Sequence, residues 1–140
     1  MRIPREIYEQ LMAHARDDAP NECCGLIGGG GGEARTLYRA RNAEASPLRY
    51  RLDPHDQFRI MSELESRDEE LAAIYHSHTN SPAYPSQTDI NLALADAGGE
   101  RVQLFPGTIY LIASLAEGEE PLRGFDITAD GVREVELELG

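Results

Sequence analysis

The sequence predicts an α+β domain with some α/β character, in which a mixed β-sheet is flanked by helices. Three helical segments alternate with short segments of strand character, and several of the strands follow one another as hairpins. The chain has 140 residues, of which 41% are hydrophobic, which is enough to bury a core without stabilising cross-links. We therefore expect residues 1–140 to form a single domain.

Three segments have the apolar periodicity and the end signals of helices. The first opens with Pro4 and is stopped ahead of Pro20, which cannot continue a helix. The second has Asp53 as its N-cap, and we expect Phe58, Met61 and Leu64 to share its apolar face. The third is expected to be closed by Gly98. These helices are predicted over residues 4–16, 54–68 and 87–97.

Strand candidates are short apolar runs bounded by turn residues. Gly28 to Gly32 are five consecutive glycines, and no Lys-Ser or Lys-Thr pair follows them as in a phosphate-binding loop. We interpret this run as a flexible hairpin connection. Asp130-Gly131 is interpreted as the turn of a closing hairpin. The strand candidates are residues 22–27, 35–41, 49–52, 71–75, 107–114, 122–127 and 132–139.

The charge and cysteine content exclude several classes of function. The net charge is -12, and an acidic chain repels the phosphate backbone, so nucleic acid is not an expected partner. No run approaches the 18 apolar residues of a membrane span, and residues 1–6 contain no secretion signal. Cys23 and Cys24 are adjacent, which disfavours a disulfide between them and suggests small buried side chains in a reducing compartment. We expect a cytoplasmic protein.

The pattern His-x-His-x₇-Ser-x₂-Asp begins at the end of the strand expected over residues 71–75. Side chains two residues apart on a strand point to the same face, so His76 and His78 lie side by side, about 6.6 Å apart at Cα. Asp89 can add an oxygen from across the intervening loop. Two nitrogens and one oxygen leave one tetrahedral position open, which is the ligand count of a catalytic zinc ion. We predict one zinc per chain.

Two further residues complete a possible hydrolytic site. Ser86-x-x-Asp89 also has the form of a helix capping box, a role that is compatible with metal binding because the cap would aim Asp89 at the histidines. The Ser86 hydroxyl could donate to the oxyanion of a tetrahedral intermediate. Hydrolysis also needs a general base. Glu22, at the start of a strand candidate, is one of several acidic residues that could serve.

Glu22 together with His76, His78, Ser86 and Asp89 resembles the motif of the JAMM (MPN+) zinc metallopeptidases at all five positions. The resemblance implies a cytidine-deaminase-like fold, with His76, His78 and Asp89 as zinc ligands. It further implies that Glu22 is the catalytic base and that Ser86 stabilises the intermediate. The signature of zinc nucleoside deaminases, His-x-Glu with Pro-Cys-x-x-Cys, is absent.

Seven segments resemble the bacterial branch of this family, which releases cysteine from the C-terminal Gly-Gly of a small ubiquitin-like sulfur-carrier protein. The resemblance implies this peptidase activity and this carrier as partner. A JAMM peptidase acting on another ubiquitin-like or peptide substrate, or a non-catalytic MPN scaffold, are the alternatives. The segments are Ala13–Arg16, Glu22–Gly25, Asn42–Glu44, Tyr50–Asp53, Ile74–Thr79, Ala83–Ser86 and Thr88–Asp89.

Overall fold

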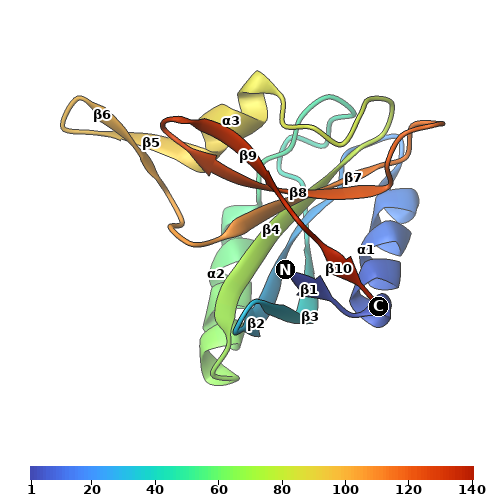
Figure 1. Cartoon of the computed structure of the whole chain (residues 1–140), viewed down its shortest axis with the longest axis horizontal. Helices are drawn as coiled ribbons and strands as arrows, with labels where there is room; N and C mark the ends of the chain where they lie inside the picture. Colours follow the sequence, from blue (N-terminus) through green and yellow to red (C-terminus); the bar gives the residue numbers. More distant parts are fainter.

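The computed structural model describes residues 1–140 and contains three helices and ten strands (Figure 1). None of the helices is long and apolar enough to cross a membrane. The helices are α1 (Arg5–Asp18), α2 (Pro54–Ser66) and α3 (Gln87–Ala93). The strands are β1 (Arg2–Ile3), β2 (Cys24–Gly30), β3 (Glu33–Ala40), β4 (Glu70–His78), β5 (Leu94–Ala97), β6 (Glu100–Gln103), β7 (Ile109–Ser114), β8 (Leu122–Thr128), β9 (Gly131–Val135) and β10 (Glu138–Leu139).

Eight strands form one mixed sheet in the order β10-β1-β3-β2-β4-β7-β8-β9. Antiparallel pairing joins β2 to both β3 and β4, whereas β4 and β7 run parallel. The connection between these parallel strands contains α3 and the separate β5–β6 hairpin, which projects from the molecule at the upper left of Figure 1. The sheet is therefore mixed and flanked by helices, as predicted.

The two faces of the sheet are covered by different helices. Alternate residues of β4 face opposite ways, so Ala73 and Tyr75 pack in the cluster under α1 while Ile74 packs in another cluster on the other face. Helix α2 covers that second face through Ile60 and Leu64. Since His76 and His78 follow Ile74 at the same period, they lie on this second face.

The apolar face predicted for the second helix, α2, was partly wrong. Asp53 caps the helix as expected, with its side chain accepting from the Asp56 amide, and Pro54 is the first helical residue. Ile60 and Leu64 form the buried stripe, because residues four apart on a helix share a face. Phe58 lies off this stripe and is 77% exposed.

The glycine run is not a flexible connection throughout. Gly28 to Gly30 belong to β2, and only Gly31 and Gly32 form the turn, with φ of 62° and 79°. A Cβ at Gly28 would collide with the Leu64 side chain, and one at Gly29 with the Glu33 carbonyl oxygen. Glycine is therefore required at Gly29 by close approach of the Glu33 backbone, and in the turn by its backbone conformation.

The third predicted helix is shorter than expected. Helix α3 ends at Ala93, and Leu94 to Ala97 pair as β5 with β6. Gly98 has the expected positive φ, 60°, but it forms a hairpin turn with Gly99 (φ 86°) instead of ending a helix. A glycine with positive φ can end a helix or form a hairpin turn, and the pairing of β5 with β6 selected the hairpin.

Residues 49–52 do not form the predicted strand. This segment makes only an isolated bridge, between Asn42 and Leu52. The Asn42 side chain hydrogen-bonds the backbone on either side of Tyr50, through the Arg49 carbonyl and the Arg51 amide. These side-chain bonds and two backbone bonds, from the Ala43 amide to the Arg51 carbonyl and from the Asp53 amide to the Arg41 carbonyl, hold a loop that reaches over His76.

Candidate metal centre

Four buried side chains from three parts of the chain converge at one end of the sheet. His76 and His78 come from the last residues of β4, Asp89 from the first turn of α3, and Glu22 from the residues just before β2. Their exposed fractions are 1%, 5%, 3% and 4%. One ligand atom from each lies within 4.8 Å of the others. Four of the five predicted site residues therefore form one cluster.

The register of the sheet brings Glu22 to the histidines. Cys24 pairs with His76 across the β2–β4 ladder, so the residues that precede β2 emerge beside the end of β4. The backbone of Glu22 is held there on both sides. Its amide donates to the Ser46 carbonyl (2.9 Å), and its carbonyl accepts from the Asn42 side chain (3.0 Å).

Asp89 is fixed by the start of α3. The Ser86 hydroxyl oxygen accepts from the Asp89 amide (3.1 Å), and Asp89 Oδ2 accepts from the Ser86 amide (2.9 Å), which is the predicted capping box. The same Oδ2 lies 3.0 Å from His76 Nε2 and 3.1 Å from His78 Nε2. One carboxylate oxygen therefore caps the helix and meets both imidazoles.

The neighbours of Asp89 keep it ionised. Burial would raise the pKa of this carboxyl, but the hydrogen bonds from His76 and His78 outweigh burial and hold the pKa below its ordinary value. Burial lowers the pKa of His76. For His78 burial is the largest influence, yet the hydrogen bonds to Asp89 and to the Pro82 carbonyl together overcome it and raise the pKa.

Glu22 carries a carboxyl without a hydrogen-bond partner on one oxygen. Its Oε1 is buried and unpaired. Burial raises the pKa of Glu22 to about 7, with the charge of Asp89 adding to the effect and that of His78 opposing it. A carboxyl with such a pKa can take up and return a proton near neutral pH.

The donor set fits a zinc ion. Each imidazole Nε2 lies at hydrogen-bond distance from the same Asp89 oxygen, and a fourth group, Glu22, faces them with an unsatisfied oxygen. Unpaired polar atoms are rare in protein interiors, and a cation held by the two imidazoles and Asp89, together with its water, would satisfy the unpaired Glu22 oxygen. Three ligands with a further group nearby is the arrangement of a catalytic zinc site.

Ser86 lies outside the cluster of four but next to it. It is exposed and occupies the N-cap of α3, where its oxygen accepts the Asp89 amide. A hydroxyl that accepts one hydrogen bond still has a hydrogen to donate. The capping role predicted for Ser86 is confirmed, and its catalytic role stays a prediction.

Two supporting residues were not identified from the sequence. The Tyr50 ring stacks on the His76 imidazole, with ring centroids 4.2 Å apart and planes inclined by 18°. Asn42 bonds to Glu22 and to the neighbours of Tyr50. Both lie in segments that resemble the family, but nothing in their residue types indicates contacts made through a loop.

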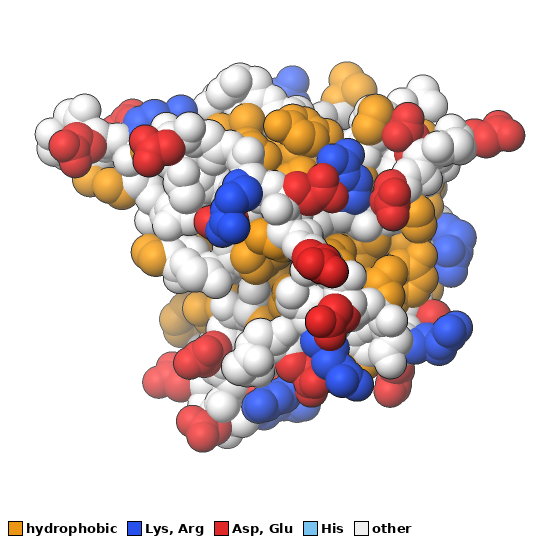
Figure 2. All heavy atoms as spheres, viewed as in Figure 1, with side chains coloured by type: hydrophobic (Ala, Val, Ile, Leu, Met, Phe, Trp, Pro, Cys, Tyr) orange, Lys and Arg blue, Asp and Glu red, His pale blue; other side chains and the backbone are white.

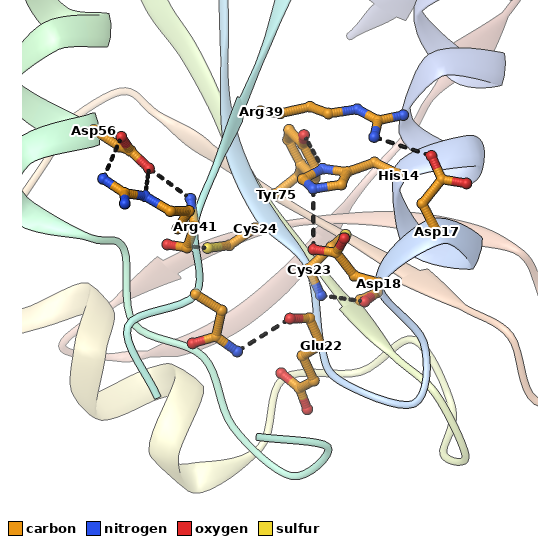
Figure 3. A network of polar contacts seen from close by, with 12 residues as sticks. His14, Asp17, Asp18, Glu22, Cys23, Cys24, Arg39, Arg41, Asp56 and Tyr75 are labelled. Carbon is orange, nitrogen blue, oxygen red and sulfur yellow. Dashed lines mark hydrogen bonds and ion pairs between the residues drawn. The ribbon is translucent and has the colours of Figure 1, made fainter. Parts of the chain in front are cut away.

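Behind the site, α1 is attached to the sheet by a buried histidine (Figure 3). The Tyr75 hydroxyl donates to His14 Nδ1 (2.6 Å), and His14 Nε2 lies 3.2 Å from Asp18 Oδ2. A neutral imidazole with its hydrogen on Nε2 satisfies both contacts. Asp17 binds Arg39 on β3 (3.0 Å), so the last turn of α1, four residues before Glu22, is fixed to the sheet at two points.

This histidine makes stability depend on pH. Burial lowers the pKa of His14 more than Asp18 and Asp17 raise it, with Arg39 acting in the same direction as burial. The unfolded chain therefore binds a proton at higher pH than the folded one, and the stabilising contribution is complete above about 6.5 and decreases as pH falls below it. Each unit of pKa depression corresponds to about 1.4 kcal/mol.

We expect the advantage in Tm of the wild type over His14→Gln to shrink between pH 8 and pH 5. Circular dichroism melts at several pH values measure this difference. The exposed His55 provides a matched control, because a His55→Gln variant should follow the wild type. A difference in Tm that is independent of pH would contradict the role assigned to His14.

The two cysteines are free and buried, as predicted. Burial raises the pKa of the Cys23 thiol to about 12 and that of Cys24 further, so both are thiols at neutral pH. Cys24 contributes to the apolar cluster below the site, and neither belongs to the metal cluster.

Comparison with known proteins identifies the family. Residues 4–127 match the family described as prokaryotic homologs of the JAB domain. The chain belongs to this family. A desampylase of Haloferax volcanii is 33% identical over 120 residues, which span 80% of this chain and 78% of that protein. A CysO-cysteine peptidase of Mycobacterium tuberculosis is 43% identical over 93 residues, 65% of this chain and 64% of the relative, so the match covers slightly less than two thirds of the relative's length.

Solved structures confirm the predicted fold. A protein of Desulfitobacterium hafniense, solved in solution, superposes with a TM-score of 0.82 at 33% identity, covering 100% of this chain and 93% of that one. A JAB1/MPN domain protein of Archaeoglobus fulgidus superposes with a TM-score of 0.61 at 19% identity, covering 99% and 98%. The chain therefore has the JAB/MPN fold, and its buried cluster is consistent with the zinc site of JAMM metallopeptidases.

Proposed function

We propose that the protein is a zinc-dependent peptidase that cleaves the bond after the C-terminal Gly-Gly of a ubiquitin-like sulfur-carrier protein and releases cysteine. The observation that carries the proposal is the buried meeting of His76, His78 and Asp89 beside the unpaired carboxylate oxygen of Glu22. The name of the mycobacterial relative, a CysO-cysteine peptidase, supports the nature of the substrate.

Each residue of the site has a role in this hydrolysis. His76, His78 and Asp89 hold the zinc ion, which when bound activates a water molecule and polarises the scissile carbonyl. Glu22 takes a proton from the attacking water and delivers it to the amine that leaves as the C–N bond breaks. The Ser86 hydroxyl donates its hydrogen to the oxygen that becomes negative as water adds to the carbonyl. Water is the only co-reactant.

The Gly-Gly end of the substrate suits a buried site. The four groups of the cluster are between 1% and 5% exposed, so the scissile bond must approach them closely. Residues without a Cβ allow such an approach, and their backbone can pair with an adjacent segment without side-chain pockets. The charged surface supports a protein partner over nucleic acid, because acidic and basic side chains lie interspersed on the face shown in Figure 2.

A second substrate class is favoured by the archaeal relative. The desampylase of H. volcanii matches 80% of this chain, more than the mycobacterial relative does. Cleavage of another ubiquitin-like conjugate at the same Gly-Gly position would use the same residues. A non-catalytic scaffold is disfavoured, because the metal ligands and the base candidate lie together in one buried cluster.

Mass spectrometry of a carrier–cysteine adduct incubated with enzyme and zinc tests the proposal. We expect the adduct to lose one cysteine, and an adduct whose last glycine is replaced by alanine to be cleaved far more slowly. If the enzyme cleaves a carrier–protein conjugate but leaves the cysteine adduct intact, the second substrate class is favoured. No cleavage of either, by enzyme shown to contain zinc, would refute the peptidase.

A further inference from the structure

The two candidate zinc-binding histidines are held in different ways. His78 donates from Nδ1 to the Pro82 carbonyl (2.7 Å), the usual means by which a metal-binding imidazole is oriented. His76 has a buried Nδ1 without any hydrogen-bond partner. Since His76 is only 1% exposed, water does not supply the missing contact freely. The only hydrogen bond of this ring is the contact of Nε2 with Asp89, at the atom that would bind zinc, so something else must orient the ring from the other side.

Tyr50 provides that restraint through its ring. The stacked arrangement, at 4.2 Å and 18°, places the tyrosine over one face of the His76 imidazole, and His78 meets the same imidazole edge-on at 5.1 Å and 61°. Aromatic pairs of this kind contribute about 0.5–1.5 kcal/mol beyond the burial of their area. Tyr50 is 4% exposed and belongs to the apolar cluster with Cys24 and Ile60, so its ring is fixed.

The backbone beside Tyr50 is held by the Asn42 side chain, in addition to a bond from the Ala43 amide to the Arg51 carbonyl. Asn42 Nδ2 donates to the Arg49 carbonyl (3.0 Å), and Asn42 Oδ1 accepts from the Arg51 amide (3.0 Å), so the two bonds bracket Tyr50. Oδ1 also accepts from the Glu44 amide (3.0 Å), and Nδ2 also donates to the Glu22 carbonyl (3.0 Å). Two acceptors face the nitrogen and two donors face the oxygen, a set that only an amide can satisfy.

We propose that Tyr50 is a positioning residue that orients His76 for zinc by ring stacking, and that Asn42 acts on the metal site through Tyr50. This inference rests on the proposed zinc site and extends it to two residues that do not touch the metal. Neither residue takes part in the chemistry. The stacked Tyr50 ring, held in place by the loop of residues 42–52, orients His76 in place of the hydrogen bond that its Nδ1 lacks.

Zinc affinity, measured by competition with a chromophoric chelator, tests the role of Tyr50. Tyr50→Leu fills much of the same space without a planar ring, and we expect zinc to bind about 10–100-fold more weakly, the usual cost of losing support behind a ligand. Tyr50→Phe keeps the ring and should bind zinc as the wild type does. Cobalt substitution gives a second readout, because a reoriented His76 changes the visible absorption bands of the bound cobalt ion.

A double-mutant cycle tests whether Asn42 acts through Tyr50. Asn42→Ala should weaken zinc binding about tenfold by releasing the backbone on both sides of the tyrosine. Combined with Tyr50→Leu, it should weaken binding no further than Tyr50→Leu does alone, because the ring that Asn42 positions is already gone. Leu48→Ser, in the same loop and 79% exposed, is the control that should leave zinc affinity unchanged.

The outcomes separate this inference from the proposed function. Wild-type protein that binds no zinc contradicts the proposed function itself. Wild-type protein that binds zinc, with Tyr50→Leu equally tight at an unchanged melting temperature, overturns the role of Tyr50 and leaves the peptidase standing. If the loss of zinc affinity in the double variant equals the product of the two single losses, Asn42 acts independently of Tyr50. That result would overturn the second half of the inference.

Discussion

Glu22→Gln is expected to keep its zinc and to lower kcat by about 10²–10⁴-fold, the usual contribution of general acid–base catalysis. Glutamine has nearly the same shape as glutamate, and the backbone bonds of residue 22 to Ser46 and Asn42 do not involve its side chain. The site should therefore assemble normally but have no group to accept the proton of the attacking water. Steady-state kinetics on the carrier adduct measure the fall in kcat, and zinc analysis of the same samples measures the retained metal.

Glu44→Gln, in the loop that contacts the Glu22 backbone, provides a matched control for this variant. Glu44 is exposed and lies in the loop that braces Glu22, so the same chemical change there should leave kcat within about twofold, as for most surface substitutions. If Glu22→Gln loses zinc, Glu22 binds the metal and its assignment as a base is wrong. A variant that keeps both zinc and full kcat would assign the base to another residue.

Asp89→Asn is expected to lose zinc and to fall below detectable activity. The substitution keeps an oxygen that can accept the Ser86 amide, so the cap of α3 can persist, but it removes the charge that faces both imidazoles. A neutral amide is a poor zinc ligand compared with a carboxylate. Elemental analysis of the purified protein and titration with zinc measure the loss.

The control for Asp89→Asn is Asp96→Asn on β5. The Asp96 side chain is 86% exposed and pairs only with Arg101 at 3.8 Å. The Asp96→Asn protein should therefore contain as much zinc as the wild type. Full zinc occupancy in Asp89→Asn would show that two histidines and another group suffice. That result would remove Asp89 from the ligand set while leaving its capping role intact.

The metal cluster could be predicted from local rules to a large extent. The alternation of side chains on a strand places His76 beside His78, and the capping box fixes the first turn of α3, so three of the four buried groups follow from sequence spacing. Glu22 could be singled out only by resemblance to the family. Its approach to the histidines depends on the pairing of Cys24 with His76, which no local pattern encodes.

The errors share one physical cause, which is that tertiary packing decides between equally good local signals. Gly98 can close a helix or a hairpin, and pairing of β5 with β6 selected the hairpin. Gly28 and Gly29 read as a flexible connection because nothing in the sequence shows that Leu64 and Glu33 occupy the space of a Cβ. The roles of Asn42 and Tyr50 depend on loop contacts across 20 and 26 residues, respectively.

The two ends of β2 differ in how well they can tolerate a change in chain length. At one end Cys24 pairs with His76, and inserting or deleting a single residue between Cys24 and Ile27 would turn every following side chain to the opposite face of the sheet. At the other end Gly31 and Gly32 form a turn with open space around both residues, beyond a β-bulge next to Gly28. Length changes in this turn would cost little free energy and would not reach the site. Relatives of this chain should therefore differ in the length of this hairpin while keeping a constant spacing between Glu22 and the core of the strand.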